Sequence, residues 1–152
     1  MRVETLERDQ VLPVSPAEAF QFFADAFNLE AITPPWLHFR VVTQGDIAMH
    51  PGTLIEYRLR LHGLPLRWLT RIESWERGRR FTDVQTRGPY RLWRHTHSFE
   101  PLDEGTRMRD VVRYALPLGP LGQAARALVV RRDLDRIFDF RRDVVAARFA
   151  RA

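Results

Sequence analysis

The sequence predicts an α+β fold in which a curved antiparallel sheet of about seven strands wraps around one long C-terminal helix. From about residue 38 to residue 116, apolar residues recur at every second position, which is typical of strands with one buried face. From Gly119-Pro120 to about Phe149 the apolar residues instead follow helical spacing. A single sheet needs a cover for its apolar face, and this helix is the only element large enough to provide it.

Residues 3–12 are expected to form the first strand, and two short helices should follow it. Ser15, Pro16 and Glu18 have the spacing of a helix N-terminus, with a capping hydroxyl, a proline at the first helical position and a capping box. A second short helix is expected at 25–31. The run Thr33-Pro34-Pro35 must end it, because proline lacks the backbone donor.

Alternating patterns predict the remaining strands. One of them places Ile55, Tyr57 and Leu59 on its inner face and Glu56 and Arg58 on its outer face. His62-Gly63 is a candidate two-residue hairpin turn. In the last helix, Arg141 lies within the apolar stripe. The expected strands are 52–61, 64–75, 80–88, 91–100 and 106–116.

Length and composition suggest one soluble domain spanning residues 1–152. The absence of cysteine, of an apolar leader and of any membrane-length apolar run predicts a cytoplasmic protein. The net charge is +5 and all 24 basic residues are arginine. These arginines alternate with acidic residues along strand faces and the last helix, so we expect no nucleic-acid binding.

The most informative stretch is 93–99, where two histidines lie on the face expected to be buried. Trp93, His95, His97 and Phe99 share that face. If residues 102–105 form the next turn, His97 faces Asp110, His95 faces Val112 and Trp93 faces Tyr114, so every pair joins two inward residues.

The turn before this strand leaves two registers open. A three-residue turn at 89–91 places Asp83 opposite His97 and Gln85 opposite His95, and brings Phe81 inward. A two-residue turn would bring Thr82, Val84 and Thr86 inward instead. We favour the first register, which puts His97 between two carboxylates.

Six polar side chains are expected on the inner face, and they cannot all lack hydrogen-bond partners, because each unsatisfied buried polar group costs about 1–3 kcal/mol. They are Tyr57, Asp83, Gln85, His95, His97 and Asp110. They either satisfy one another or face a wet, amphipathic pocket, and we favour the pocket. His97 with Asp83 or Asp110 has the residue types of an acid/base pair, although a structural network uses the same residues. No third metal ligand is evident, so no metal or cofactor is expected. The expected pocket residues are Trp36, Tyr57, Trp68, Asp83, Gln85, Trp93, His95, His97, Asp110, Tyr114 and Arg141.

Two local sequences, together with the order of elements, point to a known superfamily. They are Ile32-Thr33-Pro34-Pro35-Trp36-Leu37, and Gly88-Pro89-Tyr90 followed by Trp93, His95, His97 and Phe99. The chain resembles the SRPBCC, or START and Bet v1-like, helix-grip superfamily, and within it bacterial polyketide cyclase/dehydrase-like proteins.

That resemblance implies binding of a hydrophobic or amphipathic small molecule, such as a lipid, a quinone or an aromatic polyketide-like compound. The alternative is a cyclase or dehydratase that uses His97 with Asp83 or Asp110. A third hypothesis is a module that makes transient contact with a membrane or a partner protein, which the arginine-rich outer strand face suggests.

Overall fold

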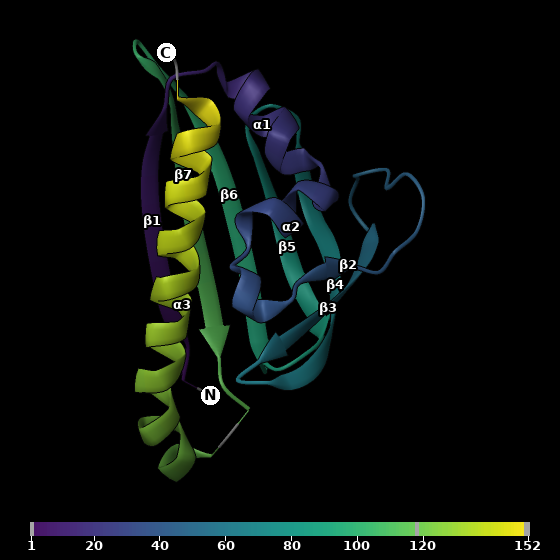
Figure 1. The fold of residues 1–152 in the computed structure, drawn as a ribbon, viewed down its shortest axis with the longest axis vertical. Coiled ribbons are helices and arrows are strands. Elements are labelled where there is room, and N and C mark those ends of the chain that lie inside the picture. Colours follow the sequence, from purple (N-terminus) through teal and green to yellow (C-terminus); the bar gives the residue numbers. More distant parts are fainter. Residues whose placement is uncertain (1, 118, 151–152) are drawn as a thin grey trace.

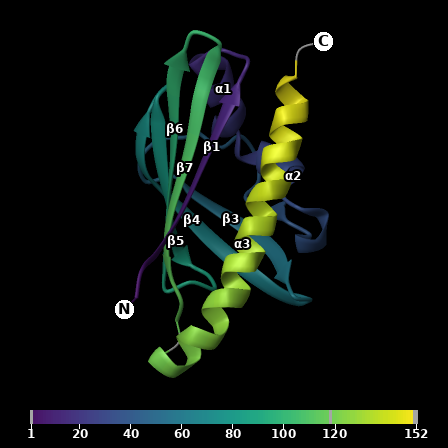
Figure 2. The ribbon, with the colours of Figure 1, turned by 90° about the vertical axis from the view of Figure 1, so that its left-hand side faces the viewer.

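The computed structural model describes residues 2–117 and 119–150, and it shows the predicted helix-grip fold (Figure 1). Seven antiparallel strands form one sheet in the order β1-β7-β6-β5-β4-β3-β2. The long helix α3 (Pro120–Phe149) crosses the concave side of this sheet (Figure 2). The strands are β1 (Glu4–Leu12), β2 (Arg40–Val41), β3 (Leu54–Leu61), β4 (Leu64–Glu76), β5 (Arg80–Arg87), β6 (Leu92–Leu102) and β7 (Gly105–Ala115).

The first helix, α1 (Pro16–Ala24), begins as the sequence predicts. The Ser15 Oγ accepts a hydrogen bond of 3.2 Å from the Glu18 amide. The predicted second helix is divided into η1 (Ala26–Asn28) and α2 (Leu29–Ile32), followed by η2 (Pro35–Leu37). The Asp25 carboxylate accepts from the Phe27 amide and so caps the start of η1.

The predicted pairing of β6 with β7 is confirmed. Trp93 lies opposite Tyr114, His95 opposite Val112, and His97 opposite Asp110. The β3–β4 hairpin also turns at His62-Gly63, and both residues have positive φ, of 50° and 81°. Two positive φ angles give the backbone twist that a two-residue hairpin turn requires.

The pairing of β5 with β6 differs from the favoured register by two residues. Phe81 lies opposite His97 and Asp83 lies opposite His95, so Asp83 is not directly across from His97. Because side chains alternate with a period of two, this shift keeps Phe81 and Asp83 on the inner face. The pairing stops at Val84 and Arg94, which leaves Gln85 outside the β5–β6 ladder.

Helix α3 covers only part of the sheet. Its Leu134 and Phe138 pack with Trp93, Val112 and Tyr114 of β6 and β7. A second cluster joins the C-terminal end of α3 to α1 and to β5–β7, and a third joins β3 and β4 to η1. Figure 1 shows α3 over β1 and β7, with the short helices placed toward β5. The β3–β5 half of the sheet is therefore left to the short helices, which pack on β3 and β4 through η1.

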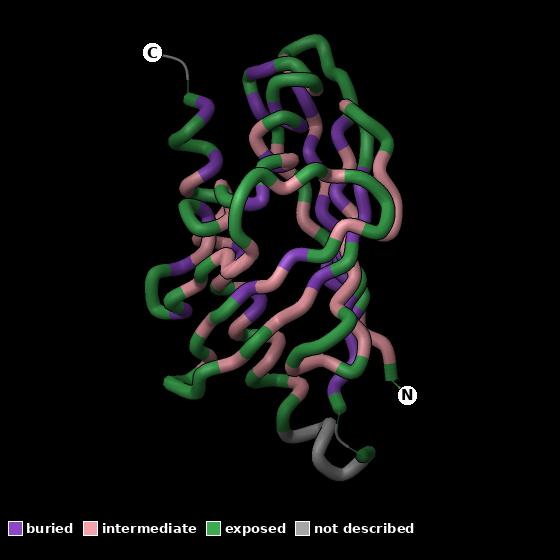
Figure 3. The backbone as a smooth tube through the Cα atoms, turned by 90° about the vertical axis from the view of Figure 1, so that its right-hand side faces the viewer, coloured by how far each residue is buried: buried purple, intermediate pink, exposed green. Residues whose placement is uncertain are grey.

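The outer face of the sheet accounts for many of the arginines. Arg107 pairs with Asp9, Arg109 with Glu7, and Arg67 with Glu56, in each case across adjacent strands. Figure 3 shows the matching alternation of buried and exposed positions along the strands. Exposed pairs of this kind contribute little stability, but they show how an arginine-rich strand face is neutralised locally.

Candidate ligand-binding site

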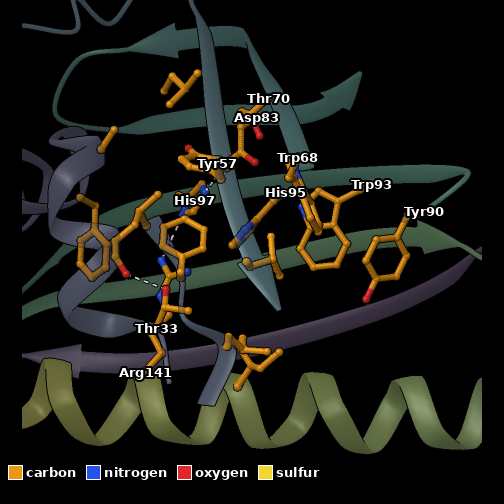
Figure 4. Close-up of a pocket in the computed structure, with 18 of the residues that line it drawn as sticks. Thr33, Tyr57, Trp68, Thr70, Asp83, Tyr90, Trp93, His95, His97 and Arg141 are labelled. Atoms are coloured by element: carbon orange, nitrogen blue, oxygen red, sulfur yellow. Dashed lines mark hydrogen bonds and ion pairs between the residues drawn. The ribbon is translucent and has the colours of Figure 1, made fainter. Parts of the chain in front are cut away.

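A cavity of about 170 Å³ lies between the β3–β6 strands, the short helices and α3. This is close to the volume of an engineered apolar cavity that admits benzene. Its lining is mostly apolar and aromatic, with a few polar groups gathered together (Figure 4). The aromatic lining residues are Phe23, Phe39, Tyr57, Trp68, Phe81, Tyr90, Trp93 and Phe138.

Seven of the eleven residues expected at the pocket line this cavity. They are Tyr57, Trp68, Asp83, Trp93, His95, His97 and Arg141. In Figure 4, Asp83, Tyr57, His97 and His95 form one group, and Trp68, Trp93 and Tyr90 lie to one side of it. The two tryptophan rings meet edge to face, with centroids 5.1 Å apart. The cavity therefore has a polar region and an aromatic region.

Two other expected pocket residues lie behind the lining. Asp110 is buried beneath the two histidines and lines a smaller hollow beside Arg8 and Arg142. Tyr114 is buried in the cluster with Trp93, Phe138 and Leu134, so it supports the aromatic wall from outside the cavity.

Gln85 and Trp36 do not lie where the sequence analysis put them. Gln85 turns away from His95, donates to the Tyr90 carbonyl at 2.6 Å and accepts from the Tyr90 amide at 3.1 Å. The Gln85 side chain thus makes the two hydrogen bonds to Tyr90 that a strand backbone would otherwise make beside the β5–β6 turn. Trp36 remains half-exposed and packs against Phe140 and Arg136 of α3.

His97 is held by protein partners through both of its ring nitrogens. Its Nε2 lies 2.8 Å from the Asp83 Oδ2, which reaches it diagonally across the strands. Its Nδ1 lies 3.3 Å from the Asp110 Oδ1 and 3.5 Å from the Arg141 Nη2. Phe81 stacks on the ring, with centroids 4.1 Å apart. No nitrogen of His97 is left for a substrate, so the geometry does not support His97 as an acid/base.

His95 is bonded through one nitrogen only. Its Nε2 lies 2.8 Å from the Asp110 Oδ1, and among the described residues its Nδ1 has no hydrogen-bond partner. The ring is buried and stacks on His97 with centroids 3.7 Å apart. The sequence placed both histidines on the inner face, but only the structure distinguishes the saturated ring from the unsaturated one.

The surroundings set opposite pKa shifts for the two histidines. Burial, together with the charge of His97, lowers the pKa of His95 to about 4. Burial also acts to lower the pKa of His97, but hydrogen bonds to Asp110 and Asp83 outweigh it and raise the value. His95 is therefore neutral at pH 7, and His97 is shifted toward the imidazolium.

The two carboxylates stay ionised although they are buried. Burial acts to raise the pKa of Asp110, but the charge of Arg141 and hydrogen bonds from His95 and His97 hold it well below its usual value. Burial opposes ionisation of Asp83 in the same way, and its bond to His97 lowers its pKa overall. The two carboxylates thus face Arg141 and His97, and the raised pKa of His97 favours its imidazolium form.

Asp83, His95 and His97 are the described residues closest to a metal-ligand set, with one candidate atom from each within 4.8 Å of the others. Asp83 and His97 already bond each other at 2.8 Å. A metal would have to displace the proton in that bond, and Arg141 nearby would oppose the added positive charge.

Several residues that line the cavity were not predicted from the sequence. Phe138 and Ile137 belong to the helical stripe, but nothing in the stripe distinguished cavity wall from solid core. Phe39 and Met49 come from irregular segments around β2, where neither period applies. Phe81 was expected to face inward, but its stacking on His97 depends on the shifted β5–β6 register.

Comparison with known proteins identifies the class of protein that this fold and cavity define. The sequence profile of the family described as polyketide cyclase / dehydrase and lipid transport matches residues 12–141. The chain belongs to this family, within the SRPBCC superfamily. No curated protein sequence matches the chain. None of the helices in the described part of the chain is long and apolar enough to span a membrane.

Similar solved structures cover nearly the whole chain at low identity. The Zhui aromatase/cyclase from Streptomyces sp. R1128 superposes with a TM-score of 0.75 at 12% identity, covering 97% of this chain and 93% of that one. Major latex-like protein 151 from Panax ginseng gives 0.69 at 10%, covering 98% and 99%. Protein Ms6760 from Mycobacterium smegmatis gives 0.74 at 17%, covering 100% and 98%. Identities this low establish the shared fold only.

Proposed function

We propose that this protein binds a hydrophobic or amphipathic small molecule in the cavity between the sheet and α3. The observation that carries the proposal is an apolar, aromatic cavity of about 170 Å³ that meets a compact group of buried polar side chains. Buried apolar walls supply affinity, and a few fixed polar groups orient the ligand. A lipid, a quinone and an aromatic polyketide-like compound all fit this description.

The family supports the same proposal. Its description combines polyketide cyclases and dehydrases with lipid transport, and these activities share the handling of an apolar molecule within the fold. The enzymatic alternative, a cyclase or dehydratase with His97 as acid/base, has weaker support, because Asp83 lies at one ring nitrogen and Asp110 at the other.

A neutral fluorescent probe tests the proposal. N-phenyl-1-naphthylamine should bind the wild-type protein with a saturable rise in fluorescence, because its rings match the aromatic wall. Ile137→Trp should block the cavity, since Ile137 lines it from α3. Leu128→Trp is the matched control, because Leu128 lies on the same helix but is 61% exposed.

We expect Ile137→Trp to lower the probe affinity by at least about 10-fold, a change of about 1.4 kcal/mol in binding free energy. The control should bind like the wild type. Leu61→Trp, which narrows the cavity from β3, provides a second blocked variant if the first folds poorly. Equal affinity in all folded variants would place the probe elsewhere and contradict the proposal.

A further inference from the structure

We propose that the cavity selects ligands with a hydroxyl group that donates a hydrogen bond to the Nδ1 of His95. The expected ligand class is a neutral aromatic molecule with such a hydroxyl, that is, a phenol or an enol. This inference rests on the proposed function, since it names the kind of molecule that the same cavity takes.

The hydrogen bond to Asp110 fixes the position of the proton on His95. Asp110 is ionised, so its Oδ1 can only accept, and the His95 Nε2 at 2.8 Å must carry the hydrogen. Because burial lowers the pKa of His95 to about 4, the ring carries no second proton at neutral pH. The Nδ1 is therefore a bare lone pair that accepts a hydrogen bond and cannot donate one.

A ligand in the cavity can approach this lone pair. His95 is 5% exposed and lines the cavity, and no described residue donates to its Nδ1. The fully enclosed polar side-chain atoms without a partner, among the described residues, belong to Glu73, Arg109 and Arg141. The Nδ1 is not among these enclosed atoms, and the His95 side chain lines the cavity. A buried acceptor in such a position is satisfied when a ligand brings a donor.

The buried charges around His95 favour a neutral ligand. Asp83 and Asp110 face Arg141 and His97, whose raised pKa favours the imidazolium, so a charged ligand group would have to enter beside a buried cluster of opposite charges. The unpartnered Nε of Arg141 is enclosed by protein and is not presented to the cavity. A carboxylate ligand would add a further negative charge beside Asp83 and Asp110, whereas a neutral donor meets an acceptor at His95.

Aromatic rings border the space beside His95. Trp93 meets the His95 ring at 86° with centroids 6.3 Å apart, and Phe138 meets it at 62° with centroids 5.7 Å apart. Trp68 extends the same wall next to Trp93. These rings offer faces and edges to a flat aromatic ligand whose hydroxyl points at the Nδ1.

Three probes with one ring system test the inference by titration against the protein at pH 7. They are 2-naphthol, which donates, 2-methoxynaphthalene, which cannot donate, and 2-naphthoate, which is anionic. In the wild-type protein, 2-naphthol should bind at least about 10-fold more tightly than each of the other two, as expected when a buried acceptor would otherwise stay unpaired.

A variant at His95 assigns the preference to this residue. His95→Phe keeps a flat ring but removes the acceptor, so the advantage of 2-naphthol over 2-methoxynaphthalene should fall below about 3-fold. Ser98→Ala, on the opposite face of the same strand, should keep the full advantage. The wild-type comparison stands on its own if His95→Phe does not fold.

Equal affinity for 2-naphthol and 2-methoxynaphthalene would overturn the inference, and so would tightest binding of 2-naphthoate, which would indicate an anion site at Arg141. If N-phenyl-1-naphthylamine binds in the cavity but 2-naphthol shows no advantage, the hydroxyl preference alone fails. If none of the four probes binds, the proposed function fails as well.

Discussion

The rings of His95 and His97 stack with centroids 3.7 Å apart and an angle of 27° between their planes, yet they favour different charge states. Burial lowers the pKa of His95 to about 4, whereas bonds to Asp110 and Asp83 outweigh burial and raise the pKa of His97. A neutral ring can stack closely on a charged one without the repulsion of two cations. The pair thus places one ring, whose raised pKa favours the imidazolium, between two carboxylates, and it leaves a neutral ring with an unpartnered Nδ1 at the cavity lining.

The first prediction is that the two histidines differ in nitrogen NMR at pH 7. His95 should show the neutral tautomer protonated at Nε2, because Asp110 accepts from that nitrogen. His97 should be shifted toward the doubly protonated form, since both nitrogens face carboxylates. Assigned long-range ¹H–¹⁵N spectra measure both states. A His95 that titrates near the ordinary histidine value would contradict the arrangement.

The second prediction is a maximum of stability near the ordinary histidine pKa of 6.5. The folded-state pKa of His95 is lowered to about 4, so between about 4 and 6.5 the unfolded chain binds a proton that the folded chain does not. Stability should fall as the pH falls through this window. The lowered pKa values of Asp83 and Asp110 act in the same direction at still lower pH.

On the alkaline side the sign is reversed, and His97 is responsible. Its folded-state pKa is raised, so its stabilising contribution is complete below 6.5 and is lost as the pH rises through the folded value. Urea unfolding at a series of pH values measures both limbs. In His95→Phe the acidic limb should become shallower. An unchanged acidic limb in that variant would exclude His95 as its source.

The third prediction concerns Asp110, which bonds His95 and lies near both His97 and Arg141. Asp110→Asn removes the charge that balances two buried cations, so it should lower the free energy of unfolding by about 3–5 kcal/mol. Asp9→Asn removes one partner of an exposed pair with Arg107 and should cost less than about 1 kcal/mol. If both variants lose less than about 1 kcal/mol of unfolding free energy, the charge of Asp110 does not stabilise the buried polar group.

The fourth prediction concerns Gly105 at the start of β7. Its φ is +142°, and a Cβ there would overlap the carbonyl oxygen of Leu12 on β1. Gly78 also has a positive φ, of +78°, but an added Cβ would meet open space. Gly78→Ala should cost about 1–2 kcal/mol from backbone strain alone. Gly105→Ala should cost about 1–3 kcal/mol more, because rigid backbone must shift. Urea unfolding of both variants measures the difference, and equal losses would rule out the clash.

The parts of the fold that follow repeating patterns could be predicted from the sequence. Parity was sufficient for β6 and β7, because Trp93, His95 and His97 must share a face and a turn at residues 102–105 pairs them with inward residues of the next strand. The cap at Ser15 and the stripe of α3 follow from local rules of the same kind.

The β5–β6 register could not be predicted, because it depends on an irregular turn. Gln85 leaves the ladder to bond the backbone of Tyr90, and the β4–β5 pairing has two register shifts, at Leu69/Thr70 and Ile72/Ser74. No residue pattern indicated either feature. As a result, the proximity of Asp83 to His97 was predicted, but the residue directly opposite Asp83, which is His95, was not.

The cavity itself follows from how α3 is placed over the sheet. The stripe from Leu134 to Val145 predicts a buried helix face, but it does not reveal that α3 covers β1 and β7 and leaves β3–β5 to the short helices. The difference between the two histidines likewise depends on which carboxylate each ring reaches. Neither fact is encoded in local spacing.

Native mass spectrometry of the purified protein, before and after extraction with organic solvent, shows directly whether the cavity holds a ligand. We expect a non-covalent small molecule that is lost on extraction, present in the wild type and in Leu128→Trp and diminished in Ile137→Trp. Protein that carries no added mass before extraction, and that also fails to take up N-phenyl-1-naphthylamine, would contradict a ligand-binding cavity.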